Sequence, residues 1–447
     1  MAAEPDEVLR NRLAGVQFKI DNRIETLRNL ARIKSGIQRQ LNNRHDPIAR
    51  LPLEISSAIF THCVASRDEY GTLSAAILLL RICTLWTEIA LFTPRLWANL
   101  HVNIPDEVTE EWVAFLAGWL ARGNDHPLLL SLGGTSASKV EVKRIIVAHA
   151  HRLRELEVQP HPYLAVFLPD EDGTVFPMLE ALFVHPTGND WRHPMDANTA
   201  VQTLKSAPLL KTLSICTKSI SNHLASEVHA HARHTALTTL RIEEMGDAGS
   251  VLLPFLTLPS LVELEIVIED RDWQTPTDHI GGLISFLTRS SPPLKALYLN
   301  ACQSAWQQDV LERLLDVVPG LETFSLWNAY EVRDVFLDLL RILDAAGRYR
   351  YLPELTELLL TVYASWPEPE WYTKLAGLLN ARAENMKYLS LDFYEWEDTP
   401  HFEPALPADE DKRIFKDLIG KGMEIDLGPV TNSLEEPSPE TPAVQPS

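Results

Sequence analysis

The sequence lacks a hydrophobic run long enough to cross a bilayer, and its first residues, MAAEPDEVLRNRL, lack the apolar core of a secretory signal. Cysteine is scarce, because the chain holds only Cys63, Cys83, Cys216 and Cys302, which are far apart and form no paired motif. This spacing argues against a disulfide framework or a zinc cluster. We therefore expect no membrane contact and a reducing compartment, which is the cytoplasm, the nucleus or both.

The common motifs of catalysis are also missing. The chain has no G-x-x-x-x-G-K-[ST] loop, no G-x-G-x-x-G, no H-E-x-x-H and no G-x-S-x-G elbow. The histidines of HAHARH, residues 229–234, are spaced at i, i+2 and i+5, which would spread them around a helix. A solvated helix end therefore fits this stretch better than a metal site. We expect no enzymatic activity, no cofactor and no metal.

Positive charge is scarce after the first fifty residues. The formal net charge is −21, and residues 1–50 hold ten Lys or Arg against six Asp or Glu, a net of +4, so the remainder carries −25. An acidic body repels nucleic acid and favours basic protein partners. Solubility alone explains this charge equally well.

One long amphipathic helix is predicted over residues 8–41. Its apolar residues step by three or four and form one stripe: Leu9, Leu13, Val16, Ile20, Ile24, Leu27, Leu30, Ile33, Ile37 and Leu41. A stripe of this length needs a partner helix or the body of the protein to cover it. A coiled coil and packing against its own chain both satisfy this need, and Gly36 with the following NNRHDP is expected to end the helix. We take residues 1–46 as a separate N-terminal segment.

Residues 47–97 read as three short helices. Pro52 suits a first helical turn, because the N–H that proline lacks would have no partner there. In LPLEISSAIFTHCV, the residues Ile55, Ile59, Phe60 and Cys63 are expected on one face. LSAAILLL predicts a second helix that is apolar nearly all round and therefore buried. The third helix contains LRICTLWTEIAL, and Thr93-Pro94 ends it.

These residues resemble an F-box, in the form found at the head of long fungal (basidiomycete-type) F-box proteins. The positions that match are Leu51, Pro52, Glu54, Ile55, Ile59, Phe60, Ile82, Cys83, Trp86, Ala90, Leu96 and Trp97. The resemblance implies a three-helix module that docks onto a Skp-family adaptor and, through it, onto a cullin. The contacts that it implies are Leu51, Pro52, Ile55, Ile59, Phe60, Ile82, Cys83, Trp86, Leu96 and Trp97. The other reading is that these residues form only the core of a helical hairpin.

A frame of Leu-x-x-Leu-x-Leu, with other apolar residues allowed, repeats after Trp97. Nine clear copies begin at Leu153, Leu179, Leu210, Leu237, Leu261, Leu294, Leu321, Leu355 and Met386, and the stretches WANLHV and PLLLSL are weaker members. Successive starts lie 24 to 34 residues apart, and helical stretches fill the gaps. Because one helix and one strand cannot bury their own apolar faces, the units must stack. The fold class is therefore α/β, with an N-terminal helix and a three-helix F-box followed by a curved, leucine-rich-repeat-like α/β solenoid with a parallel sheet over residues 98–428.

The residues between the frame leucines are expected on the exposed face of the sheet. This face gathers carboxylates in the early and middle repeats and aromatic rings in the later ones. The rings that we expect to bind a target protein are those of Tyr298, Trp327, Tyr363, Tyr388, Tyr394 and Trp396. Rigid rings among carboxylates suit a protein with basic residues. A cap over the end of the solenoid is the other interpretation of the same rings.

The tail, residues 429–447, is rich in Pro and Glu and is expected to be disordered. The sequence as a whole favours a substrate-receptor subunit of a Skp–cullin–F-box ubiquitin ligase. The alternative is a non-catalytic interaction scaffold with no coupling to a ligase.

Overall fold

The computed structural model describes most of the chain. The described residues are 6–65, 72–105, 107–134, 140–158, 175–184, 197–218, 231–245, 252–269, 279–300, 308–327, 333–363, 369–394, 406–428 and 431. The chain divides into two compact units, residues 1–133 (unit 1) and 134–447 (unit 2). Apart from Thr431, the predicted tail lies outside the described residues.

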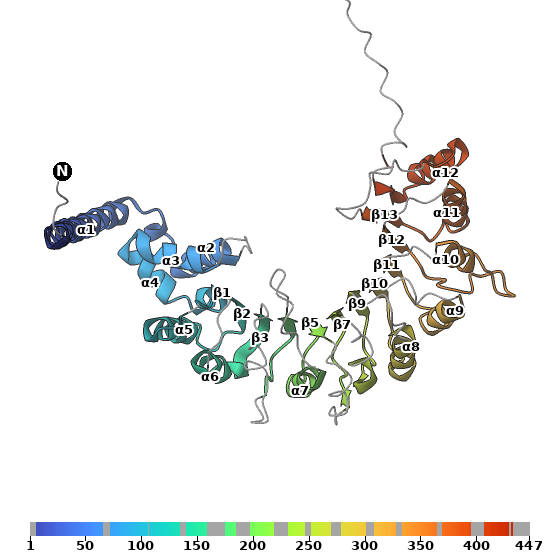
Figure 1. The fold of residues 1–447 in the computed structure, drawn as a ribbon, viewed down its shortest axis with the longest axis horizontal. Coiled ribbons are helices and arrows are strands. Elements are labelled where there is room, and N and C mark those ends of the chain that lie inside the picture. Colours follow the sequence, from blue (N-terminus) through green and yellow to red (C-terminus); the bar gives the residue numbers. More distant parts are fainter. Residues whose placement is uncertain are drawn as a thin grey trace, which may run out of the picture. The chain divides into compact units, whose positions relative to one another are not determined.

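Unit 1 begins with the long helix that the apolar stripe predicts. Helix α1 spans Asp6–His45 and runs through Gly36, which therefore does not end it (Figure 1). A short 3-10 helix, η1 (Ile48–Arg50), follows. No helix among the described residues is both long enough and apolar enough to cross a membrane.

Three short helices follow, as predicted, but the third begins only at Thr84, so Ile82 ends the second helix and Cys83 is the N-cap of the third. They are α2 (Leu53–Ala65), α3 (Thr72–Ile82) and α4 (Thr84–Leu91), and η2 (Pro94–Trp97) closes the group. Their shared core contains Phe60, Ala76, Leu79, Ile89, Ala90, Leu96 and Trp97. The prediction that the second helix is buried nearly all round is wrong at one position, because Leu78 on α3 is 59% exposed.

The first repeat of strand and helix also belongs to unit 1. Strand β1 (Asn99–Asn103) pairs in parallel with β2 (Leu128–Gly133), and α5 (Glu110–Arg122) connects them. The rings of Trp97 and Trp119 pack edge to face with centroids 4.7 Å apart, which joins η2 to α5. The two weak members of the repeated frame therefore form strands.

In unit 2 each of the nine clear copies of the frame forms a parallel strand, and a tenth strand, β14, follows them. The strands are β3 (Leu153–Val158), β4 (Ala181–Val184), β5 (Thr212–Lys218), β7 (Thr239–Met245), β9 (Glu263–Glu269), β10 (Ala296–Asn300), β11 (Thr323–Trp327), β12 (Glu357–Tyr363), β13 (Tyr388–Tyr394) and β14 (Glu424–Asp426). Neighbours from β3 to β14 pair in that order, and all these pairs are parallel. The second and third apolar positions of the frame are buried, as Leu156 and Val158 show.

Helices cover one face of this sheet. They are α6 (Val140–Ala148), α7 (Ala197–Ser206), α8 (His279–Ser290), α9 (Gln308–Val317), α10 (Arg333–Leu340), α11 (Pro369–Ala381) and α12 (Asp409–Gly420). Within unit 2, Figure 1 shows the strands in one layer, on the concave side, and these helices in a second layer outside it. The predicted α/β solenoid with a parallel sheet is confirmed.

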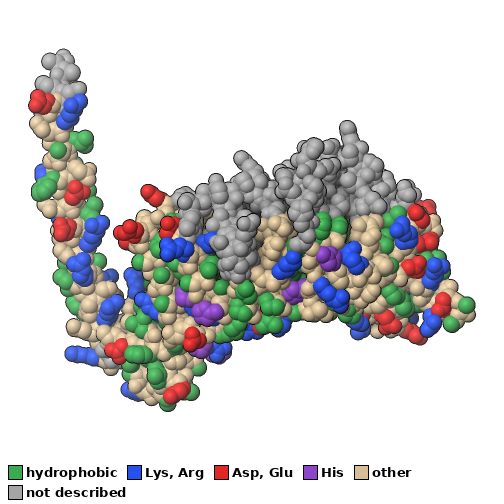
Figure 2. All heavy atoms as spheres, turned by 90° about the horizontal axis from the view of Figure 1, so that it is seen from below, with side chains coloured by type: hydrophobic (Ala, Val, Ile, Leu, Met, Phe, Trp, Pro, Cys, Tyr) green, Lys and Arg blue, Asp and Glu red, His purple; other side chains and the backbone are tan. Residues whose placement is uncertain are grey.

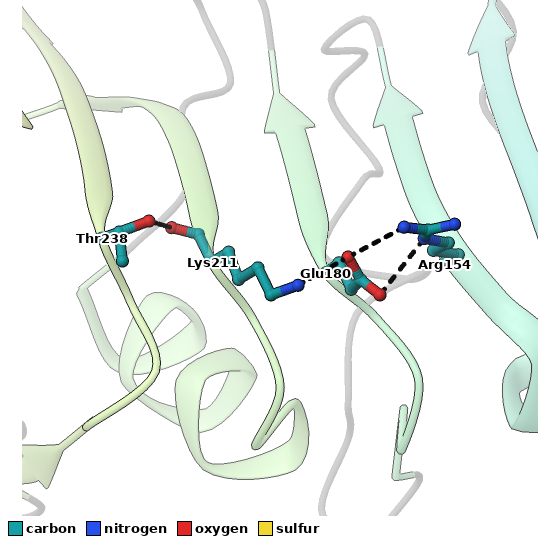
Figure 3. Close-up of polar contacts among 4 residues, drawn as sticks. All are labelled: Arg154, Glu180, Lys211 and Thr238. Atoms are coloured by element: carbon teal, nitrogen blue, oxygen red, sulfur yellow. Dashed lines mark hydrogen bonds and ion pairs between the residues drawn. The ribbon is translucent and has the colours of Figure 1, made fainter.

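A row of residues just before the strands fixes the register of the repeats. The amide of Glu180 donates to the carbonyl oxygen of Arg154, and the amide of Lys211 donates to that of Glu180, both at 2.8 Å. The same type of hydrogen bond, from each amide to the carbonyl oxygen of the preceding member of the row, recurs at Thr238, Val262, Lys295, Glu322, Thr356, Lys387 and Glu424. Side chains strengthen the row where charges alternate, because Glu180 accepts from Arg154 at 3.2 Å and from Lys211 at 3.0 Å (Figure 3).

The histidine-rich stretch differs from its prediction as a solvated helix end. Its described part contains β6 (Ala232–Arg233), which pairs with β8 (Leu256–Thr257). His234 is buried, and its two ring nitrogens lie 3.0 Å from the carbonyl oxygen of Ala207 and 3.1 Å from the amide of Leu237. These backbone partners give the imidazole a structural role that its spacing in the sequence does not reveal.

Candidate functional site

An exposed apolar row lies along the start of α2 in unit 1. The amides of Ile55 and Ser56 both donate to the carbonyl oxygen of Pro52 at 3.1 Å, so the proline stands immediately before the first turn. The apolar side chains here stay largely in solvent: Leu51 is 40% exposed, Leu53 52%, Ile55 49% and Ile59 37%. Together with the exposed Pro52, these residues form what we name the α2 row.

The opposite side of α2 faces the core. Ser56 and Phe60, four residues apart, are buried, and the Phe60 ring lies 4.9 Å from that of Trp86 between centroids. The prediction that Phe60 shares a face with Ile55 and Ile59 is therefore wrong. The helix is apolar on two sides, and an apolar pattern alone does not say which side meets the core.

Cys83 and Trp86 form a small polar joint at the start of α4. The sulfur of Cys83 accepts from the amide of Trp86 at 3.5 Å and so caps the helix. The indole N–H of Trp86 donates to a carboxylate oxygen of Asp46 at 2.7 Å, which ties α4 to the segment that follows α1. Trp97 is held in a comparable way, because its indole N–H donates to the carbonyl oxygen of Ala90 at 2.8 Å.

The ten positions that the F-box resemblance implies therefore separate into three groups. Leu51, Pro52, Ile55 and Ile59 are exposed, Ile82 and Trp86 are half-buried, and Phe60, Cys83, Leu96 and Trp97 are buried. The buried four belong to the interior of unit 1 and do not present a surface. Leu53 joins the row although the sequence analysis did not select it, and its exposure follows only from the direction in which α2 packs.

A second candidate surface lies on the helix-free face of the sheet in unit 2. Parallel pairing places Arg241, Glu265, Tyr298 and Ser325 side by side on β7, β9, β10 and β11. Glu263, Thr323 and Glu357 lie in the row just before them, and Trp327 ends β11 with 43% of its surface exposed. We name these eight residues the inner-sheet patch.

Charges and hydrogen bonds order this patch. Arg241 and Glu265 form an ion pair at 3.4 Å, and Thr323 donates from its hydroxyl to Glu357 at 3.0 Å. The indole N–H of Trp327 donates to the hydroxyl of Ser325 at 3.1 Å, which holds the ring against the sheet.

Burial and like charge shift two pKa values in the patch. Burial raises the pKa of Glu265, against the opposing effect of Arg241. Burial also raises the pKa of Tyr298, and the nearby carboxylates of Glu263, Glu357 and Glu265 raise it further. A cation placed among these carboxylates would relieve their mutual repulsion.

The other predicted target-binding rings are only partly described. Tyr388 starts β13 and is half-buried. Tyr363 and Tyr394 are the last residues of β12 and β13, but their side chains lie outside the described residues, as does all of Trp396. Among the predicted rings, Tyr298 and Trp327 are therefore the two whose described side chains belong to the inner-sheet patch.

No group of three or more His, Cys, Asp or Glu that could hold a metal ion occurs among the residues that the structure describes. Both candidate surfaces are open faces of helices or strands.

Comparisons with known proteins give little further information. No protein-family model matches the chain, and no curated protein is significantly similar to it. Among solved structures, a protein from Bacteroides fragilis, determined as a structural-genomics target, is 14% identical and has a TM-score of 0.36. That match covers 73% of this chain and 74% of the other, and its low TM-score carries no argument.

Proposed function

We propose that this protein is a substrate receptor of a Skp–cullin–F-box ubiquitin ligase. In this proposal the α2 row binds the Skp-family adaptor, which brings the cullin, and the inner-sheet patch binds a target protein. The observation that carries the proposal is the α2 row itself. Its apolar side chains stay exposed on a helical group that already has a complete core of its own.

The size of the row is sufficient for a contact but not for a whole interface. Fully burying a Leu or Ile side chain is worth about 1.5–3 kcal/mol. Because Leu51, Leu53, Ile55 and Ile59 are between 37% and 52% exposed, covering all four contributes on the order of 4 kcal/mol. Further contacts from the rest of the adaptor would have to supply the remainder, as in other interfaces with a few central anchors.

The inner-sheet patch suits a target with Lys or Arg side chains. Trp327 and Tyr298 offer ring faces to a cation, while Glu263, Glu265 and Glu357 offer carboxylates. The chain itself would make and break no bond. Its contribution would be proximity, because it would hold the target's lysines near a ubiquitin-conjugating enzyme bound elsewhere in the complex.

Binding to a purified Skp-family adaptor tests the first half of the proposal. Ile55→Asp/Ile59→Asp should weaken binding on the order of 100-fold, because a carboxylate would have to be buried in an apolar contact. Leu209→Asp is the matched control, because Leu209 lies in unit 2 and is 51% exposed, close to the 49% of Ile55. Circular dichroism should show all three proteins folded.

Two outcomes would oppose the assignment. If the double variant bound the adaptor as tightly as the wild type, the α2 row would not be the adaptor-binding surface. A wild-type chain that does not bind any adaptor offered would instead favour the scaffold, which uses the inner-sheet patch without a ligase.

Target capture tests the second half. We expect Tyr298→Ala/Trp327→Ala to lose the proteins that the intact chain captures, measured by quantitative mass spectrometry. Ile342→Ala, which changes an apolar side chain 40% exposed, should lose none. The same captured set from the double variant and the intact chain would place target binding elsewhere.

A further inference from the structure

The apolar stripe of α1 is almost uncovered in the single chain. From Leu13 to Leu41 its nine large side chains are between 41% and 70% exposed. In Figure 2 the long helix carries hydrophobic side chains (green) and Lys or Arg (blue) along its length. Near its C-terminal end, Arg39 donates to the carbonyl oxygen of Leu80 on α3 at 3.4 Å. Forty residues of helix span about 60 Å, so this is a long apolar surface in water.

The stripe follows a heptad pattern. Counting Leu13 as position a places Ile20, Leu27, Lys34 and Leu41 at the other a positions. The d positions are then Val16, Arg23, Leu30 and Ile37. Most of these are the apolar residues of a coiled-coil seam, and two charged residues, Arg23 and Lys34, interrupt it.

The two interruptions decide between the orientations of a homodimer. In a parallel pair every position meets its own copy, so Arg23 would face Arg23 and Lys34 would face Lys34 within the seam. Like charges held opposite each other in an interface repel and suppress that pairing. A parallel pairing of this helix with itself is therefore disfavoured.

An antiparallel pairing removes both conflicts in a single register. If residue i lies opposite residue 50 − i, every a position meets a d position: Leu13 faces Ile37, and Ile20 faces Leu30. Arg23 then faces Leu27, and Lys34 faces Val16. A long basic side chain can lie along an apolar neighbour and keep its charge in water. By the same rule Ile24 lies opposite Thr26, and the two-fold axis passes at residue 25.

The charge of the two halves favours the same orientation. Residues 6–25 hold four acidic and four basic side chains, whereas residues 26–45 hold five basic and no acidic ones. A parallel pair brings the two basic halves together, and an antiparallel pair places each basic half beside a balanced half. The charge of the two halves and the register of the seam therefore favour the same orientation.

We propose that two copies of this chain associate through α1 as an antiparallel coiled coil, with residue i opposite residue 50 − i. The two-fold symmetric contact uses the same surface of both copies, as most homodimers do. The inference does not rest on the adaptor or the target.

The mass of the full-length protein in solution tests the association. Light scattering coupled to gel filtration at micromolar concentrations should give twice the monomer mass of 50.4 kDa. Ile20→Asp/Leu30→Asp should weaken the dimer on the order of 100-fold, because four carboxylates would enter the seam. Asn22→Asp/Ser35→Asp adds the same charges outside the seam and should leave the dimer intact.

Cysteine cross-linking tests the orientation in a Cys63→Ser background, since Cys63 is exposed. Leu13→Cys and Ile37→Cys proteins should form a disulfide with each other when mixed, and neither should do so alone. A wild-type chain that is monomeric in solution overturns the proposal. The apolar stripe of α1 would then be available to a helix of a different protein. A dimer in which Leu13→Cys cross-links to itself overturns the antiparallel register.

Discussion

The side chain of Trp86 donates a hydrogen bond from its indole N–H to Asp46, with 2.7 Å between the nitrogen and the carboxylate oxygen. The second oxygen of Asp46 accepts from the amide of Ile48 at 2.9 Å. One carboxylate therefore fixes both the turn after α1 and the ring that packs on Phe60. Trp86 is one of the positions that resemble an F-box, whereas no pattern in the sequence singles out Asp46.

Asp46→Ala should loosen unit 1. It leaves the half-buried indole N–H and the amide of Ile48 without their acceptor, which costs about 1–3 kcal/mol. Amide hydrogen exchange of α4 should accelerate, whereas that of α11 in unit 2 should not. Asp46→Asn keeps one acceptor oxygen, so the exchange rate of α4 should lie between those of the wild type and Asp46→Ala. Equal protection of α4 in the wild type and both variants would contradict the role of Asp46 in holding α4.

Phe60 and Ile59 are adjacent in sequence and should differ sharply in their effect on stability. Phe60 is 1% exposed, so Phe60→Ala should cost about 3–5 kcal/mol by leaving a cavity. Ile59 is 37% exposed, so Ile59→Ala should cost less than about 1 kcal/mol. Urea unfolding followed by circular dichroism measures both. Similar losses would mean that α2 packs in another orientation.

Arg382 should be among the most sensitive positions in unit 2. Its guanidinium is buried and donates to the carbonyl oxygens of Leu340, Tyr351 and Leu352 at 2.7 to 3.1 Å, and burial lowers its pKa to about 10. It remains charged at neutral pH. Arg382→Leu leaves these carbonyls unpaired, and the loss should be on the order of 3–5 kcal/mol.

Two variants control for Arg382. Arg382→Lys should recover only part of the loss, because one ammonium group cannot match the planar fork of the guanidinium. Arg341→Leu changes the exposed arginine that follows Leu340 and should alter the free energy of unfolding by less than about 0.5 kcal/mol. Equal urea midpoints for Arg382→Leu and Arg341→Leu would rule out the structural role of Arg382.

Glu265 and Glu180 should change stability with pH in opposite directions. The pKa of Glu265 is raised above 4.5 by burial, so its favourable contribution is present below pH 4.5 and is lost as the pH rises through the folded value. The pKa of Glu180 is lowered, chiefly by its hydrogen bond from Lys211. Its contribution is present above pH 4.5 and is lost as the pH falls through the folded value.

Urea midpoints measured from acidic to neutral pH check these signs. Relative to the wild type, Glu265→Gln should become more stable as the pH rises, and Glu180→Gln should become less stable. Each variant serves as the control for the other, since both remove one carboxylate from the same sheet. If the stability of both variants relative to the wild type changed with pH in the same direction, the opposite pKa shifts of Glu265 and Glu180 would be contradicted.

The repeated frame was the most informative feature of the sequence. Each copy carries apolar residues at fixed positions, and a parallel strand buries the same positions in every repeat, so nine frames gave nine strands. The long helix followed from one uninterrupted stripe in the same direct way. Local patterns of this kind are set by the period of the backbone and depend little on what lies around them.

The direction in which an element packs was harder to predict. Both sides of α2 are apolar, so only the fold places Phe60 inside and Ile55 outside. His234 is buried because backbone groups of Ala207 and Leu237 meet its ring, and one of these lies 27 residues away. Such contacts between distant segments leave no periodic signal in the sequence.

The backbone row from Arg154 to Glu424 makes each repeat an interchangeable module. The amide of Lys295 donates to the carbonyl oxygen of Val262, and the amide of Glu322 donates to that of Lys295. If residues 294–320 were removed, Glu322 would take the place of Lys295, and its amide could donate to the carbonyl oxygen of Val262. Starts separated by anything from 24 to 34 residues already enter one row without disturbing it. An array built in this way can lengthen or shorten by whole modules while its remaining strands keep their register.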